Sequence, residues 1–135
     1  MRELLSEYRH EYDILFNEYE LMGVLLNHNQ ILQRIKDLKI ESCYIYGGGF
    51  LGIQCYRSIC EMTEVKGIVD KSGGLKFNLP EIRVVDMDTF KNSYAQDMVI
   101  ITPVKYASEI YKELIEFIQD DRLLFLGEFV LGDVG

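Results

Sequence analysis

A short apolar segment that runs directly into a glycine-rich turn constrains the fold of this chain more than any other feature. The segment spans residues 43–46 and reads as a buried strand. The turn that follows consists of Gly47, Gly48, Gly49, Phe50, Leu51 and Gly52. Gly47, Gly49 and Gly52 have the G-x-G-x-x-G spacing of a turn that leads from a strand into a helix and binds a dinucleotide. In such a turn the first glycine permits the tight bend, the second lets a phosphate approach the backbone, and the third lets the helix lie close to the strand.

The rest of the chain from residue 42 onward alternates short apolar stretches with helical patterns, which predicts a parallel α/β sheet. The expected strands are 43–46, 65–70, 82–85, 97–101 and 122–126. The expected helices are 50–62, a brief turn at 86–90 and one starting at Thr102, with a tail over 127–135. Because parallel crossovers are right-handed, the predicted fold is Rossmann-like, three-layered, with about five strands in the order 3-2-1-4-5.

The helix expected after the fourth strand has its own start signal. Thr102 reads as an N-cap and Pro103 as the first helical residue. Its apolar face is formed by Tyr106, Ile110, Leu114 and either Phe117 or Ile118. The order of strands reverses between the first and the fourth, so a crevice is expected where the glycine turn meets Thr102 and Pro103. Thr102 therefore has a second interpretation, as a hydroxyl that lines this crevice.

Residues 1–40 are predicted to form a helical arm of two helices that precedes a Rossmann-like domain over residues 41–135. Residues 2–26 carry a heptad seam of Leu5, Tyr8, Tyr12, Leu15, Tyr19, Met22 and Leu26. The seam has two interpretations: a helix packed on its own domain, or a contact with a second copy or another protein. Buried tyrosine hydroxyls need partners, which suits a partly hydrated interface. We therefore expect a homo-oligomer, a dimer in the simplest case, formed through this helix.

Charge and composition exclude several classes of partner. The net charge of −8 disfavours a nucleic-acid backbone or an anionic membrane surface. No apolar run reaches about 18 residues, so no membrane span is expected. The acidic, amphipathic N-terminus lacks the apolar stretch of a signal peptide. Cys43, Cys55 and Cys60 are odd in number and form no C-x-x-C pair, which is typical of buried free thiols in a cytoplasmic protein.

Asp70 strengthens the case for a ligand at the glycine turn. It ends the second strand, 18 residues beyond Gly52, near the place of an acid that accepts hydrogen bonds from ribose hydroxyls. A carboxylate there repels a 2′-phosphate and so favours NAD over NADP, although Lys71 beside it offsets part of that repulsion. The candidate binding residues are Gly47, Gly48, Gly49, Phe50, Leu51, Gly52, Asp70, Lys71, Thr102 and Pro103. The alternative is a sheet that keeps its glycines for packing alone, with Asp70 as a solvated or capping residue.

The same residues do not predict a reaction. No histidine or cysteine in the crevice elements has an evident partner, and backbone amides bind but do not exchange protons. Asp86 and Asp88 permit a metal pair, but N-capping of the helical turn at 86–90 is the simpler interpretation. We therefore expect a binding domain, with enzymatic activity left open, no catalytic residue and no metal.

Four segments together resemble a known group of domains. They are 44–52, 65–71, 82–85 and 98–103, within residues 42–126. They look like the Rossmann-like domains of bacterial surface-polysaccharide biosynthesis, which precede nucleotide-sugar dehydratase/epimerase domains or form the N-terminal part of sugar acetyltransferases. The resemblance implies a nucleotide-sugar or NAD ligand. Phe50 stands where those acetyltransferases often have histidine, and their β-helix and the second dehydratase domain have no counterpart here, so neither activity is implied.

Two functions follow from these patterns. The first is an accessory nucleotide-binding protein, specific for NAD or a nucleotide-sugar, in surface-polysaccharide biosynthesis. The second is a protein-interaction module whose sheet is a scaffold without ligand and whose N-terminal helix mediates association.

Overall fold

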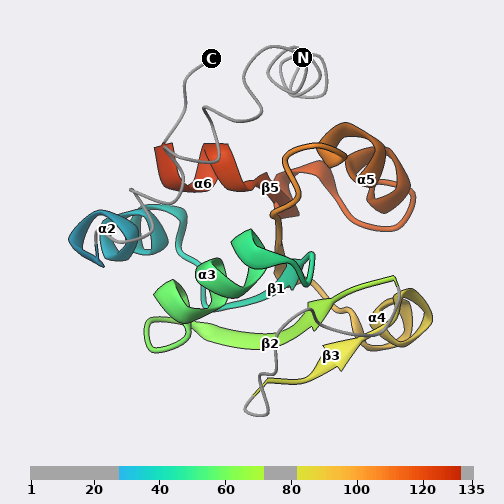
Figure 1. The fold of residues 1–135 in the computed structure, drawn as a ribbon, viewed down its shortest axis with the longest axis horizontal. Helices are drawn as coiled ribbons and strands as arrows, with labels where there is room; N and C mark the ends of the chain where they lie inside the picture. The colour runs from blue at the N-terminus through green and yellow to red at the C-terminus, as the bar shows by residue number, and fades with distance from the viewer. Residues whose placement is uncertain (1–27, 72–81, 132–135) are drawn as a thin grey trace.

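A five-stranded parallel sheet forms the centre of the molecule. The computed structural model describes residues 28–71 and 82–131 (Figure 1). The strands are β1 (Ser42–Tyr46), β2 (Glu64–Val69), β3 (Val84–Val85), β4 (Met98–Ile101) and β5 (Leu123–Phe125). Their order in the sheet is β3-β2-β1-β4-β5, which confirms the predicted α/β fold and strand order. The helix predicted over 2–26 lies outside the described residues.

The central strand β1 pairs with β2 and β4 along its whole apolar length. Tyr46, its last residue, lies opposite Val69 of β2 and Ile101 of β4. The chain leaves β1 toward β2 on one side and later returns to β4 on the other. The carboxyl end of β1 is therefore the point at which strand order reverses, where ligands bind in open parallel sheets.

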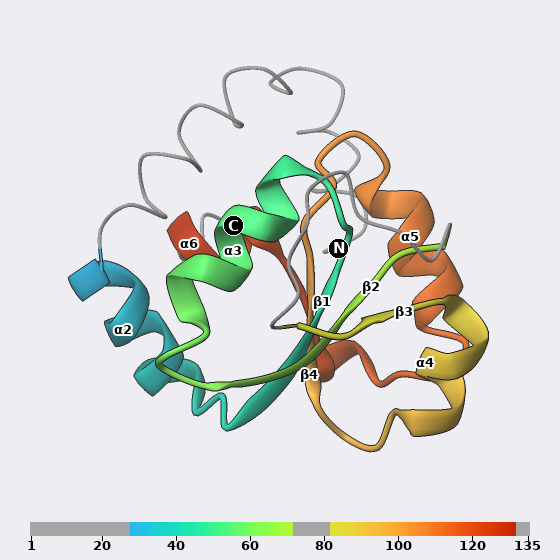
Figure 2. The same cartoon turned by 60° about the horizontal axis from the view of Figure 1, so that its bottom comes forward.

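Helices cover both faces of the sheet. They are α2 (His28–Leu38), α3 (Phe50–Ile59), α4 (Met87–Ser93), α5 (Ala107–Leu114) and α6 (Leu126–Leu131), with a 3₁₀ turn at Asp120–Arg122. Figure 2 shows α2, α3 and α6 on one side of the strands and α4 and α5 on the other. Alternation along β1 serves both layers, because Cys43 and Ile45 join the core under α3 while Tyr44 and Tyr46 join the core under α5.

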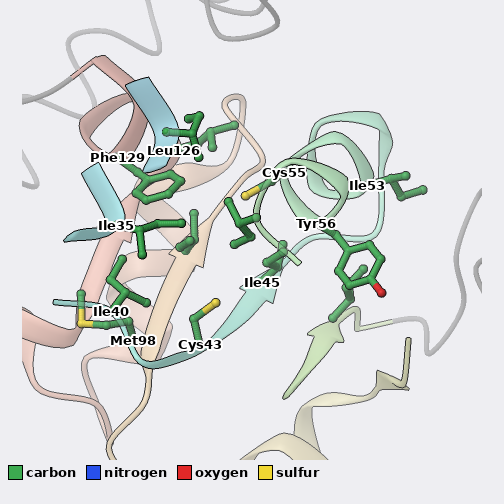
Figure 3. Packing of buried hydrophobic residues seen from close by; sticks show 14 residues of the cluster. Ile35, Ile40, Cys43, Ile45, Ile53, Cys55, Tyr56, Met98, Leu126 and Phe129 are labelled. Atoms are coloured by element: carbon green, nitrogen blue, oxygen red, sulfur yellow. The ribbon is translucent and has the colours of Figure 1, made fainter. Parts of the chain in front are cut away.

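The C-terminal segment is a helix, so the predicted tail over 127–135 is wrong for the part that the structure describes. Helix α6 starts directly after β5 and buries Leu126 and Phe129, which are 2% and 0% exposed. Both side chains pack in the cluster shown in Figure 3, beside Ile35 of α2. Arg34 of α2 donates hydrogen bonds to the carbonyl oxygens of Phe129 and Glu128, at 2.9 and 3.1 Å. Apolar residues three apart, right after a buried strand, are the signal for this helix.

The helix predicted to start at Thr102 starts later. Helix α5 begins at Ala107, with Tyr106 at the N-cap position, so the N-cap assigned to Thr102 and the first helical position assigned to Pro103 are wrong. The reason is that the Thr102 hydroxyl donates to the carbonyl oxygen of Tyr46, at 2.8 Å, and ties the ends of β4 and β1 together. Tyr106, expected in the core, is 53% exposed.

The short helix α4 confirms the other capping prediction. The Asp86 carboxylate accepts a hydrogen bond from the backbone N–H of Thr89, at 2.8 Å. This bond lowers the pKa of Asp86 below its ordinary value. The capping interpretation of Asp86 is therefore the one that the structure supports.

A buried carboxylate, that of Asp97, links β1, β2 and β4 near the amino ends of β1 and β4. Asp97, just before β4, is 5% exposed. Its Oδ1 atom accepts a hydrogen bond from the hydroxyl of Ser42 in β1 and lies 2.9 Å from the Lys66 ammonium nitrogen of β2. Burial raises the pKa of Asp97, but the hydrogen bonds from Ser42 and Lys66 and the charge of Lys66 outweigh it, so the pKa lies below its ordinary value.

The cysteines differ in their environments. Cys43 and Cys55 are buried in the core under α3, as predicted for free thiols, whereas Cys60 is exposed just after that helix. Among the described residues, no helix has the length and apolar character that crossing a membrane requires.

Candidate functional site

The glycine turn holds α3 tightly against the sheet. Gly47 adopts a φ of +115°, which favours glycine, and its N–H donates to the carbonyl oxygen of Val69 at 2.8 Å. Gly52 lies directly beneath the turn, where a Cβ atom would overlap the carbonyl oxygen of Gly47. Gly49 differs from both, because a Cβ atom there would meet no atom within 4 Å. The close approach of α3 at Gly52 and the open space at Gly49 are the features that the glycine spacing predicts for a phosphate-binding turn.

The amino end of α3 has no side-chain cap. Gly49 occupies the N-cap position in an extended conformation, and no side chain accepts a hydrogen bond from the first turn there. The first amides of a helix and its dipole attract an anion at this end. The open space beside Gly49 leaves room for such a group.

A cleft of about 480 Å³ lies between the glycine turn, the end of β2 and helix α5. It is lined by Tyr46, Gly47, Gly48, Gly49, Val69, Asp70, Lys71, Pro103, Tyr106, Glu109, Ile110 and Glu113. Its size is in the range of small-molecule and cofactor sites. The cleft is at the carboxyl edge of the sheet, where the strand order predicts a ligand.

Six of the ten candidate binding residues line this cleft. They are Gly47, Gly48, Gly49, Asp70, Lys71 and Pro103. The other four lie elsewhere: Gly52 is beneath the turn, Leu51 packs toward the core under α3, Phe50 is 50% exposed, and Thr102 is 2% exposed. Thr102 thus holds the strands that support the cleft and is not among its described lining residues.

The opposite wall comes from α5, which the sequence did not identify. Tyr106, Glu109, Ile110 and Glu113 follow one another at helical spacing along one side of this helix. The Glu113 carboxylate accepts a hydrogen bond from the Lys71 ammonium, at 2.9 Å, so an ion pair joins the end of β2 to α5. The described walls carry three carboxylates, from Asp70, Glu109 and Glu113, and one ammonium. This balance favours ligands of low negative charge.

Tyr46 is a further residue of the cleft that sequence reasoning missed. Its side chain is 4% exposed, and its hydroxyl has no hydrogen-bond partner among the described residues. Burial raises the pKa of Tyr46 to about 12, with added contributions from the Glu113 and Asp70 carboxylates. The available signal was its position: a tyrosine at the last residue of a buried strand, directly before the turn, places a polar atom where the ligand is expected.

Fold and site together define an α/β protein with a Rossmann-like sheet and a ligand-sized cleft at its switch point. Comparison with protein-family models, with curated proteins and with solved structures finds no match.

Proposed function

We propose that this protein binds a nucleotide-type ligand, NAD or a nucleotide-sugar, in the cleft between the glycine turn and α5. The observation that carries the proposal is that one cleft contains both the glycine turn at the uncapped amino end of α3 and Asp70 at the end of β2. These two features recognise the two polar parts common to all nucleotides.

Each part of such a ligand has a complementary surface. A phosphate group rests against the backbone at Gly49, where a Cβ atom would meet no atom within 4 Å. The ribose hydroxyls donate to the Asp70 carboxylate. The half-exposed ring of Tyr106 at the rim offers an apolar surface to the base.

The charge of the cleft ranks the candidate ligands. Asp70 and Glu109 repel phosphates, while the charges of Lys71 and Glu113 offset each other in their ion pair. NAD carries a positive nicotinamide ring that offsets one of its phosphate charges, whereas a UDP-sugar keeps both and NADP adds a third phosphate. We therefore expect NAD to bind more tightly than UDP-glucose, and UDP-glucose more tightly than NADP.

Thermal unfolding in the presence of millimolar NAD, UDP-glucose or NADP tests the proposal. A ligand that binds only the folded state raises the melting temperature. Gly49→Val should remove the shift, because a branched side chain then fills the approach to the backbone amides. The same variant should melt close to the wild type without ligand, since a Cβ atom at this position meets no neighbour within 4 Å.

An unchanged melting temperature would contradict the proposal. If none of these nucleotides raises the melting temperature of the full chain, nucleotide binding is wrong and the scaffold function gains support. The surface-polysaccharide setting rests on the sequence resemblance, and a preference for NADP over both other ligands would argue against the charge ranking.

A further inference from the structure

Tyr46 lines the cleft, and its hydroxyl takes no part in the proposed phosphate and ribose contacts. It is buried, and it has no hydrogen-bond partner among the described residues. Buried polar groups in folded proteins are nearly always paired, because an unpaired one forgoes the hydrogen bonds that water supplied. Tyr46 lines a ligand-sized cleft, so its unpaired hydroxyl points to a partner from outside the chain.

Tyr44 provides an internal comparison. It lies two residues earlier in β1, faces the same side of the sheet, and is 2% exposed. Its hydroxyl lies 3.2 Å from the hydroxyl oxygen of Ser93 in α4, a hydrogen bond in which either group donates. The fold thus satisfies the phenol that is remote from the cleft and leaves unsatisfied the phenol that lines it.

The surroundings of Tyr46 define the chemistry of the missing partner. Burial, followed by the charges of the Glu113 and Asp70 carboxylates, raises the pKa of Tyr46, so the phenol stays protonated at neutral pH and is able to donate. Ionised carboxylates only accept hydrogen bonds. A ligand hydroxyl accepts from the phenol and donates to a carboxylate, whereas a phosphate oxygen is repelled by both acids.

We propose that Tyr46 is a specificity-determining residue of the cleft, whose hydroxyl donates a hydrogen bond to a sugar hydroxyl while the neighbouring carboxylates accept hydrogen bonds from the same sugar. The inference rests on the proposed function, since the sugar is the ribose or hexose of the nucleotide-type ligand. It adds a donor at Tyr46 to the acceptor proposed at Asp70.

The ion pair between Lys71 and Glu113 lines the same cleft as Tyr46. It joins the two walls, and its side chains are 62% and 35% exposed. Exposed ion pairs contribute little to stability, so a sugar displaces the ammonium at low cost. Glu113 then becomes available as an acceptor beside Tyr46.

Tyr46→Phe and Tyr44→Phe form a matched pair for the test. Calorimetric titration of the full chain with NAD and with UDP-glucose should show about tenfold weaker binding for Tyr46→Phe. The same variant should unfold at the wild-type temperature or above it, because it removes an unpaired buried hydroxyl. Tyr44→Phe should show the reverse, with unchanged affinity and a lower melting temperature. Equal affinity of wild type and Tyr46→Phe, or a loss of stability in Tyr46→Phe that matches Tyr44→Phe, would overturn the inference.

A different set of titration results is expected if the protein binds no nucleotide. If wild-type protein binds neither nucleotide, titration with D-ribose and D-glucose decides the role of Tyr46. Sugar binding that weakens in Tyr46→Phe keeps the inference while nucleotide binding is rejected. Absence of sugar binding as well overturns both.

Discussion

The carbonyl oxygen of Gly47 occupies the space in which a side chain at Gly52 would begin. The two residues bring the turn and the first helical turn of α3 into direct backbone contact. This contact sets how closely the helix lies to β1, and hence where the amino end of α3 stands beside the cleft. Because the carbonyl oxygen of Gly47 is a backbone atom, it cannot move aside as the end of a flexible side chain can.

Gly52→Ala should therefore be strongly destabilising. The added methyl group forces the turn or the helix to move, at a cost of about 3 kcal/mol or more in the free energy of unfolding. Gly49→Ala is the matched control, because its Cβ atom meets open space. We expect the control to stay within about 0.5 kcal/mol of wild type in urea unfolding. Similar stability of the two variants would contradict this close contact between Gly47 and Gly52.

Phe129→Ala tests the position of α6 in the core. This ring is 0% exposed and packs with residues of α2 and the sheet (Figure 3). Its truncation should lower the free energy of unfolding by about 3–5 kcal/mol. Phe50→Ala, at a ring that is 50% exposed, should cost about 1 kcal/mol or less. If Phe129→Ala were as mild as Phe50→Ala in urea unfolding, the C-terminal segment would not be part of the core.

The fall in the free energy of unfolding at acidic pH should depend on Asp97. Its pKa is lower in the folded protein than its ordinary value of 3.8. The stability it contributes is therefore fully present above about pH 5 and is lost as the pH falls through the ordinary and then the folded pKa. Between about pH 5 and about pH 3, the free energy of unfolding of wild type should fall more steeply than that of Asp97→Asn. Urea unfolding across this range measures both slopes, and parallel slopes would show that the carboxylate does not stabilise the fold.

Lys66→Met separates the ion pair from the hydrogen bond at the same carboxylate. It removes the ammonium 2.9 Å from Asp97 but keeps the hydroxyl of Ser42. The acid dependence should therefore lie between those of wild type and Asp97→Asn. A slope identical to wild type would assign the effect to the hydrogen bonds from Ser42 and from the backbone of Ala95.

Much of the fold was predictable from local pattern. The apolar runs at 43–46 and 98–101 identify strands buried on both faces, and the alternation with helices implies parallel order. The glycine spacing predicted the tight turn at Gly47 and the close helix at Gly52. Local start signals were less reliable: Asp86 caps its helix, but Thr102 does not, because its hydroxyl finds the carbonyl oxygen of Tyr46 from the neighbouring strand.

What the sequence determined by itself is the strand order and the turn, because both follow from short-range spacing and from the handedness of crossovers. Only the tertiary structure decided what faces the turn. Helix α5 supplies the acidic wall opposite the turn. The Lys71–Glu113 ion pair joins residues 42 positions apart, and no local sequence pattern predicts such a contact. The unpaired hydroxyl of Tyr46 is likewise a feature that only the tertiary structure decided. A tyrosine in a strand is ordinary in sequence, and whether its hydroxyl finds a partner depends on which side chains the packed helices bring to it.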